Sequence, residues 1–353
     1  METFFSASNK IKTNSCSIPA GFLDRIPRER EFSSSEEYSS AVNKALEEES
    51  RKHSERIERD LDVVDFFKFS AEEFLYEYAA LGKPLIIKNS TTKWPLPSKF
   101  WSIELLERFF GDSEYVVRKG DDYTSMQTRS ETFTSYIASL RKSSFNVFES
   151  QDLDCTTQEI DASWYGANNW IPPGLIPYID IPKYYPSWTS RMLDTKIWVG
   201  PEGTGAHLHS DMHDNFVVQL IGEKRFTLIA PHHRASLGAT SFTSNLMSSP
   251  IDIHNIEASR YPEAALLKEK GKIFEYTLHP GDALYLPAGW FHSTRNLNSD
   301  VCCSINFWQA ACYGSARVIV PNIGPPDWIV KPGSATKQDV ETLLASIRNS
   351  QNS

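Results

Sequence analysis

The stretch GTGAHLHSDMHDNFVVQLIGEK, residues 203–224, carries the densest group of metal-ligand side chains in this chain. Its first half is rich in histidine and aspartate, and an apolar run over residues 216–221 follows. Side chains of a β-strand alternate between its two faces, so four of these groups are predicted to share one face. These are His207, His209, Asp211 and His213. Imidazole and carboxylate without a nearby cysteine suit a first-row metal such as iron, but parity leaves open which of the four bind it.

The overall composition is that of an ordinary globular protein. The chain has 353 residues, of which 40% are hydrophobic and 12% aromatic. A net charge of −9 argues weakly against nucleic acid as the main partner. No apolar run approaches the roughly 20 residues that a membrane span needs, and residues 1–15 lack the apolar core of a secretory signal. The five cysteines show no disulfide-framework or CxxC spacing, so we expect an intracellular protein, cytoplasmic and/or nuclear, without membrane association.

Changes in composition and in the spacing of apolar residues divide the chain into three parts. Residues 1–64 are predicted to be an extension with a charged helix, which begins where Ser34 and Glu37 have capping-box spacing. Residues 65–315 are predicted to be a compact catalytic domain. Residues 316–353 contain a Pro/Gly linker and a last helix with apolar side chains at helical spacing.

Short strands dominate the compact part, and helices gather toward its N-terminal side. Helices are predicted over 69–81, which has capping-box spacing at its start, and over 102–110, which ends at a glycine. The predicted strands span residues 84–88, 114–119, 144–149, 196–199, 216–221, 225–230 and 283–286. This pattern predicts an all-β barrel or sandwich decorated by helices.

Two further features bear on a functional site. Lys224 is in phase with the apolar side chains of the strand 225–230. It therefore either points inward toward an anion or lies solvated in a hairpin. In the second feature, tight turns at Pro280–Asp282 and Pro287–Gly289 deliver His292 beside two aromatic residues. The other histidines, His232, His233 and His254, lie in a turn-like insertion over 231–272 and are predicted to be surface residues.

Two motifs resemble those of the cupins. The spacing G-x5-P-x-G-x2-H-x3-N of the second cupin motif is met by Gly281, Pro287, Gly289, His292 and Asn296. The first motif is met by Gly203, His209, Asp211, Asn215 and Gly222, with Asp211 at the second histidine position and Asn215 at the glutamate position. An H-x-D pair with a distal histidine is similar to the pattern of JmjC-domain, cupin-8-like Fe(II)/2-oxoglutarate oxygenases. The resemblance covers about residues 65–315.

The resemblance implies a mainly β fold with flanking helices around a double-stranded β-helix (cupin or jelly-roll) core. It implies that His209, Asp211 and His292 hold Fe(II) as a two-histidine, one-carboxylate facial triad. His207 and His213 then become neighbours of the metal site. If His207 and His209 bind instead, the site is a more ordinary cupin metal centre.

The resemblance also implies 2-oxoglutarate and O2 as co-substrates. Lys224 matches the family lysine that binds the distal carboxylate of 2-oxoglutarate. Asn215, Asn306 and Trp308 are expected to line the co-substrate, the last two on one strand face.

Two positions depart from the family pattern. Ala206 replaces a hydroxyl residue, so the contact is either absent or supplied by another hydroxyl, for which Thr204 and Thr227 are the candidates. Residues 146–151 lack the family tyrosine, and Tyr165 from a different loop is a candidate substitute.

The implied activity is hydroxylation of a protein or peptide side chain with release of succinate and CO2. The alternatives are a tRNA-base or small-molecule (natural-product) hydroxylase, a histone-lysine demethylase, and a non-catalytic metal-binding cupin. In related hydroxylases a C-terminal helical segment forms a homodimer. The helix near residues 340–347 therefore either dimerises or covers its own barrel.

Overall fold

The computed structural model describes most of residues 61–310, together with residues 33, 34 and 37. Within 61–310 the undescribed positions are 71–72, 80–81, 120–126, 150–163, 181–191, 212, 240, 244–245 and 299. The predicted linker and C-terminal helix, and the charged N-terminal helix beyond its start, lie outside the described residues. At that start the Glu37 amide donates to Ser34 Oγ over 3.1 Å, as the capping spacing predicts.

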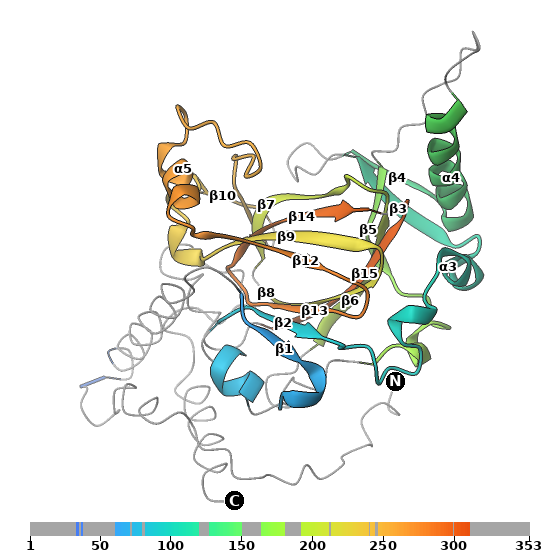
Figure 1. Ribbon diagram of the computed structural model, residues 1–353, viewed down its shortest axis with the longest axis horizontal. Helices are drawn as coiled ribbons and strands as arrows, with labels where there is room; N and C mark the ends of the chain where they lie inside the picture. The colour runs from blue at the N-terminus through green and yellow to red at the C-terminus, as the bar shows by residue number, and fades with distance from the viewer. Residues whose placement is uncertain are drawn as a thin grey trace, which may run out of the picture.

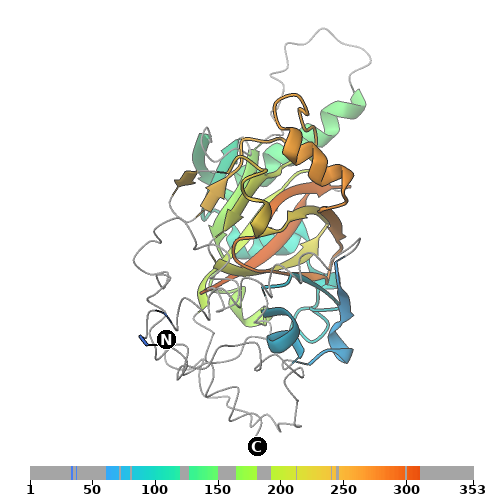
Figure 2. The same cartoon turned by 90° about the vertical axis from the view of Figure 1, so that its left-hand side faces the viewer.

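Two β-sheets form the body of the molecule (Figure 1). The larger contains, in spatial order, β1 (Val63–Asp65), β2 (Leu85–Lys88), β13 (Ala283–Leu286), β8 (His213–Ile221), β15 (Cys302–Ala310), β6 (Met192–Gly200), β5 (Trp164–Trp170), β3 (Glu114–Lys119) and β4 (Gln127–Thr132). The smaller contains β10 (Ser241–Thr243), β11 (Leu246–Ser248), β7 (Gly205–Asp211), β14 (Phe291–Leu297), β9 (Glu223–Ile229) and β12 (Ile273–Leu278). Figure 2 shows the same strands from the side. The predicted jelly-roll core is confirmed.

The chain changes sheets within the stretch 203–224. Strand β7 belongs to the smaller sheet and ends at Asp211, whereas β8 starts at His213 in the larger sheet. The prediction of one strand face shared through residue 213 is therefore wrong. The chain returns to the smaller sheet through Gly222, whose φ of +66° suits a residue without a side chain.

The apolar run of β8, which only Gln219 interrupts, is explained by burial on both faces. Phe216 and Val218 pack in the cluster on the outer side of the larger sheet, together with Phe74. Val217 instead packs between the sheets, in a cluster with Leu228.

The predicted helix starts and stops are largely confirmed. In the segment before β2, Ser70 and Glu73 form a reciprocal capping box over 2.9 and 3.1 Å, and the following turn, Phe74–Ala79, is π-helical. Helix α3 (Ile103–Phe110) begins at Ser102, whose Oγ accepts from the Leu105 amide, and ends at Gly111.

The strand predicted over 144–149 is wrong, because these residues end helix α4 (Phe133–Glu149). The helix is set by its first half, where Phe133, Tyr136, Ile137 and Leu140 are buried at i, i+3, i+4 and i+7. The local valine and phenylalanine content at its end is overridden by that periodicity.

Other segments complete the fold. The insertion 231–272 contains β10, β11 and α5 (Pro262–Glu269). Figure 1 shows α5 on the side of the molecule opposite α3 and α4. Within the described segments, none of the helices has the length and apolar character that crossing a bilayer requires.

Gly205 allows two strands to approach each other closely at the start of β7. A Cβ built there would overlap the carbonyl of Thr294 on β14, which is backbone and has little room to move. We expect Gly205→Ala to lower the free energy of unfolding by about 1–3 kcal/mol or more, as overpacking does. The matched control is Gly174→Ala, whose new Cβ meets only the Phe109 ring at 3.3 Å. Urea unfolding of both variants checks this, and equal midpoints would contradict it.

Candidate active site

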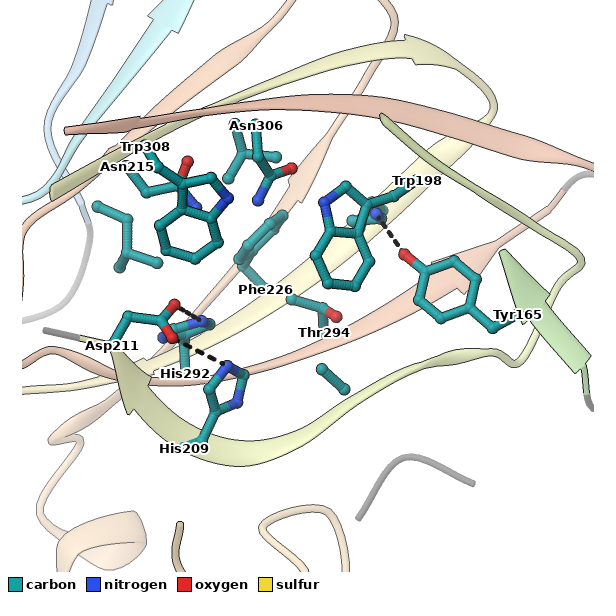
Figure 3. A pocket seen from close by; sticks show the side chains of 14 residues that line it. Tyr165, Trp198, His209, Asp211, Asn215, Phe226, His292, Thr294, Asn306 and Trp308 are labelled. Carbon is teal, nitrogen blue, oxygen red and sulfur yellow. Dashed lines mark hydrogen bonds and ion pairs between the residues drawn. The ribbon is translucent and has the colours of Figure 1, made fainter. Parts of the chain in front are cut away.

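Three side chains converge between the sheets near the end of β7. Candidate ligand atoms of His209, Asp211 and His292 all lie within 4.8 Å of one another. The Nε2 atoms of the two histidines lie 3.8 and 3.5 Å from the Asp211 carboxylate oxygens. His209 on β7 is the direct cross-strand partner of His292 on β14, which explains how residues far apart in sequence meet. Figure 3 shows the three at one end of a cavity.

The orientation of both imidazoles is set by backbone hydrogen bonds. His209 Nδ1 lies 2.6 Å from the His207 carbonyl oxygen, and His292 Nδ1 lies 3.0 Å from that of Trp290. A proton on each Nδ1 serves those carbonyls and leaves each Nε2 lone pair facing Asp211. This is the arrangement that metal-binding histidines use.

The electrostatics of the trio favour a bound cation. Burial raises the pKa of Asp211 to about 7 and lowers the pKa of His292 to about 4. Burial, and then the nearby His292, also hold the pKa of His209 well below its usual range. Asp211 Oδ2 is buried without a hydrogen-bond donor. Two neutral imidazoles and a carboxylate lacking a donor fit a divalent metal of the Fe(II) type.

The remaining histidines lie away from this cluster. A β-bulge in β7 between Ala206 and His209 shifts the strand phase, so both of these residues line the cavity although they are three positions apart. His207 instead contacts the Ser249 carbonyl over 3.0 Å and is outside the lining. His213, on the other sheet, packs edge-on against Trp308.

No other trio of His, Cys, Asp or Glu gathers in this way among the described residues. The insertion histidines His232, His233 and His254 thus take no part in such a cluster.

Lys224 points into the same cavity. Its side chain is buried, and its Nζ donates to Tyr165 Oη over 3.0 Å and to Ser304 Oγ over 2.6 Å. Lys224 is the second residue of β9 in the smaller sheet, whereas both hydroxyls belong to the larger sheet, so the ammonium bridges the two. Burial lowers the pKa of Lys224 to about 8. Among the described residues its hydrogen-bond partners are neutral, which leaves the charge available to an anionic ligand.

The cavity wall contains most of the predicted co-substrate residues. Asn215, Asn306 and Trp308 all line it. Thr204 lies outside the lining; its hydroxyl donates to the Pro201 carbonyl over 2.7 Å and accepts from Asn296. Thr227 also lies outside the lining, with its hydroxyl 3.3 Å from Glu275.

Several lining residues were not predicted as site residues, and one candidate lies on a different element than predicted. Thr294 on β14 is the cross-strand partner of Ala206, the position at which the family pattern has a hydroxyl residue. Thr294 lines the same cavity. The sequence contained a signal for this residue, because Thr294 follows His292 by two positions and residues two apart on a strand share a face. Tyr165 lies on strand β5 rather than on a loop. Trp198 on β6 also lines the cavity, and no local signal marked it.

Comparison with known proteins agrees with this geometry. Residues 70–313 match the family described as a cupin-like domain. Lysine-specific demethylase JMJ30 of Arabidopsis thaliana is 28% identical over 241 residues, which cover 68% of this chain and 52% of the relative. Jumonji C domain-containing protein 5 of Drosophila melanogaster is 27% identical over 261 residues, covering 72% and 61%. The human bifunctional peptidase and (3S)-lysyl hydroxylase JMJD7 is 23% identical over 262 residues, covering 67% and 79%.

This chain spans only about half the length of several of the curated relatives that it matches. The resemblance to JmjC-domain, cupin-like proteins is confirmed. The length difference means that the activities of the whole relatives bear on this chain only through the shared domain.

The geometry predicts that His292→Ala weakens divalent-metal binding strongly, because it removes one of the three candidate ligands. The matched control is His207→Ala, since His207 is on the same strand as two of the ligands but outside the cavity. Isothermal titration with Mn(II) measures both variants. Equal loss of affinity in both would mean that the ligand set has been assigned incorrectly.

The lowered pKa of Lys224 predicts a pH-dependent affinity for 2-oxoglutarate. The ammonium is present below about pH 8 and is lost as the pH rises through that value. A dicarboxylate binds the ammonium form, so its affinity for the Mn(II)-loaded protein should fall by about tenfold between pH 7 and 9.

Two variants test this assignment. Lys224→Met should bind the dicarboxylate weakly at both pH values. Lys224→Arg stays charged at both pH values, so the dicarboxylate affinity that it retains should not change between pH 7 and 9. Wild-type affinity that is unchanged between pH 7 and 9 would contradict the prediction.

Proposed function

Because this chain belongs to the cupin-like domain family, we propose that it is an Fe(II)- and 2-oxoglutarate-dependent oxygenase that hydroxylates a protein or peptide side chain. The observation that carries the proposal is the shared cavity of the His209–Asp211–His292 trio and the buried Lys224. A metal site and a separate buried cation in one cavity suit a ligand that chelates the metal at one end and carries a carboxylate at the other.

The chain's own residues have separate tasks in this proposal. His209, Asp211 and His292 would hold the iron and leave three coordination positions open. When bound, the iron supplies O2-dependent C–H hydroxylation coupled to the conversion of 2-oxoglutarate to succinate and CO2. Retention of Asp211 favours hydroxylation over halogenation, because the carboxylate occupies the position that a halide would need.

Lys224 would bind the far carboxylate of 2-oxoglutarate. Tyr165 and Ser304 already hold its Nζ in place, so little side-chain entropy is lost on binding. Thr294 is placed to add a hydroxyl donor, which compensates for Ala206 across the strand pair.

Aromatic and apolar side chains restrict water in the cavity. Trp198, Phe226 and Trp308 line it together with Val217 and Leu286. Besides Asp211 Oδ2, two further polar atoms of the cavity wall are buried without a hydrogen-bond partner, namely Trp198 Nε1 and Asn215 Oδ1. An N–H and an amide left unpaired are costly unless a ligand satisfies them, which supports a polar ligand here.

The names of two of these relatives support a protein or peptide as the substrate. JMJ30 is named a lysine-specific demethylase and JMJD7 a lysyl hydroxylase. Both names describe chemistry at lysine side chains of proteins. We favour hydroxylation for this chain, and demethylation is an outcome that the experiment distinguishes.

The test is the release of succinate from 2-oxoglutarate by Fe(II)-loaded protein in air. Wild-type protein should release succinate slowly without a prime substrate and faster in a cell lysate, whereas Asp211→Ala should release none. Mass spectrometry of the lysate peptides should show a gain of one oxygen atom that depends on active protein. Loss of methyl groups would identify a demethylase instead. Absence of succinate from metal-loaded wild-type protein would refute the oxygenase proposal.

A further inference from the structure

Two chain crossovers between the sheets lie side by side at the metal end of the cavity. The first runs from Asp211, the last residue of β7, to His213, the first of β8. The second runs from Leu286, the last residue of β13, through a turn to Phe291, the first of β14. Each crossover adjoins a metal-ligand residue, since Asp211 ends β7 and His292 is the second residue of β14. The relative position of the crossovers therefore sets the relative position of the ligands.

Asp214 joins these two crossovers. Its Oδ1 accepts from the Ala288 amide over 2.8 Å, and its Oδ2 accepts from Tyr285 Oη over 3.1 Å. Both donors belong to the second crossover or to the strand that enters it. A backbone hydrogen bond lies next to these two, in which the Gly289 amide donates to the Asp211 carbonyl over 2.8 Å. The turn that precedes His292 is thus held on two successive amides by the segment that carries Asp211.

The same turn is held from its other side by Trp290. Its Nε1 donates to the Gly82 carbonyl over 2.8 Å, and its own carbonyl oxygen lies 3.0 Å from His292 Nδ1. A shift of the turn would therefore move Trp290 and the imidazole that it orients.

Burying the carboxylate of Asp214 at this position costs free energy of folding. Its side chain is buried, with 2% of its surface exposed, and the Tyr285 ring that it contacts packs against Phe74 and Phe216. A buried carboxylate in such surroundings is tolerated only when hydrogen-bonded, and an apolar residue would avoid the cost. Asn215, the next residue, faces the cavity instead. Asp214 therefore acts from outside the cavity.

We propose that Asp214 is a positioning residue for the metal centre, which sets the distance between His292 and the His209–Asp211 pair through the Ala288 turn. Asp214 is not among the residues that line the cavity, and it accepts from the Ala288 amide and from Tyr285 Oη. The inference rests on the three-residue metal site of the proposed function and not on the oxygenase activity.

The chain offers a matched control at the opposite end of β13. Asp282 is also a buried carboxylate beside a turn, with 5% of its surface exposed. Its Oδ2 accepts from the His279 amide over 3.0 Å and from Lys88 Nζ over 2.7 Å. Asp282→Ala should therefore cost stability as Asp214→Ala does, without reaching the metal ligands.

The experiment is titration of metal-free, full-length protein with Co(II), followed by visible absorption. The spectrum of bound Co(II) reports ligand geometry, which a loss of stability alone does not change. Asp214→Ala should bind Co(II) about 10–100-fold more weakly, as loss of an outer hydrogen-bond partner does, and should alter the spectrum. Asp214→Asn keeps an oxygen acceptor for the Ala288 amide and should recover most of the affinity. Asp282→Ala should match wild type in affinity and spectrum.

Tyr285→Phe provides a milder second variant if Asp214→Ala does not fold. It removes the bond to Oδ2 and keeps the ring, and it should weaken Co(II) binding in the same direction by a smaller factor. Wild-type affinity and spectrum in Asp214→Ala, or in Tyr285→Phe where the alanine variant is unfolded, would overturn the proposal. Equal losses in Asp214→Ala and Asp282→Ala would also overturn it. Wild-type protein that binds no Co(II) would refute the metal centre itself, and this proposal with it.

Discussion

The site depends on one cross-strand pair, His209 on β7 opposite His292 on β14. The hydrogen-bond ladder between neighbouring strands holds directly opposed residues at a short, fixed separation. Two imidazoles placed in this way need only one more donor to form a metal site. Asp211 supplies it two positions further along β7. The bulge beside Ala206 keeps His209 and Asp211 facing the cavity while it turns His207 away.

The interior of the sandwich is divided by chemistry. Toward β12 and the far end of β13, apolar side chains such as Leu228, Leu278 and Leu284 fill the space between the sheets. In the cavity, buried polar groups replace them, and the ammonium of Lys224 connects the smaller sheet to hydroxyls of the larger one. Burying this charge is unfavourable, which its lowered pKa reflects. Such a cavity has less packing stability than an apolar core, and it suits the anionic ligand of the proposed function.

Local sequence patterns predicted much of the fold because they act over a few residues. Ser70 with Glu73, and Ser102 with Gly111, marked helix boundaries that the structure contains. The failure at residues 144–149 has the same origin. A short window with valine and phenylalanine favours a strand, whereas the buried stripe of the preceding residues continues a helix through it. The contact of Tyr165 with Lys224 has no local sequence signal, because it joins residues 59 positions apart.

The sequence by itself determined the kinds of ligand, their spacing within each motif and the turns that deliver them. These properties follow from strand periodicity and from the backbone preferences of glycine and proline. Only the tertiary structure decided which histidines face the cavity, which hydroxyl stands across from Ala206, and which carboxylate joins the two crossovers. The physical reason is that strand register, a bulge and the change of sheet after Asp211 set these distances. None of the three is encoded in the local spacing of the residues that they bring together.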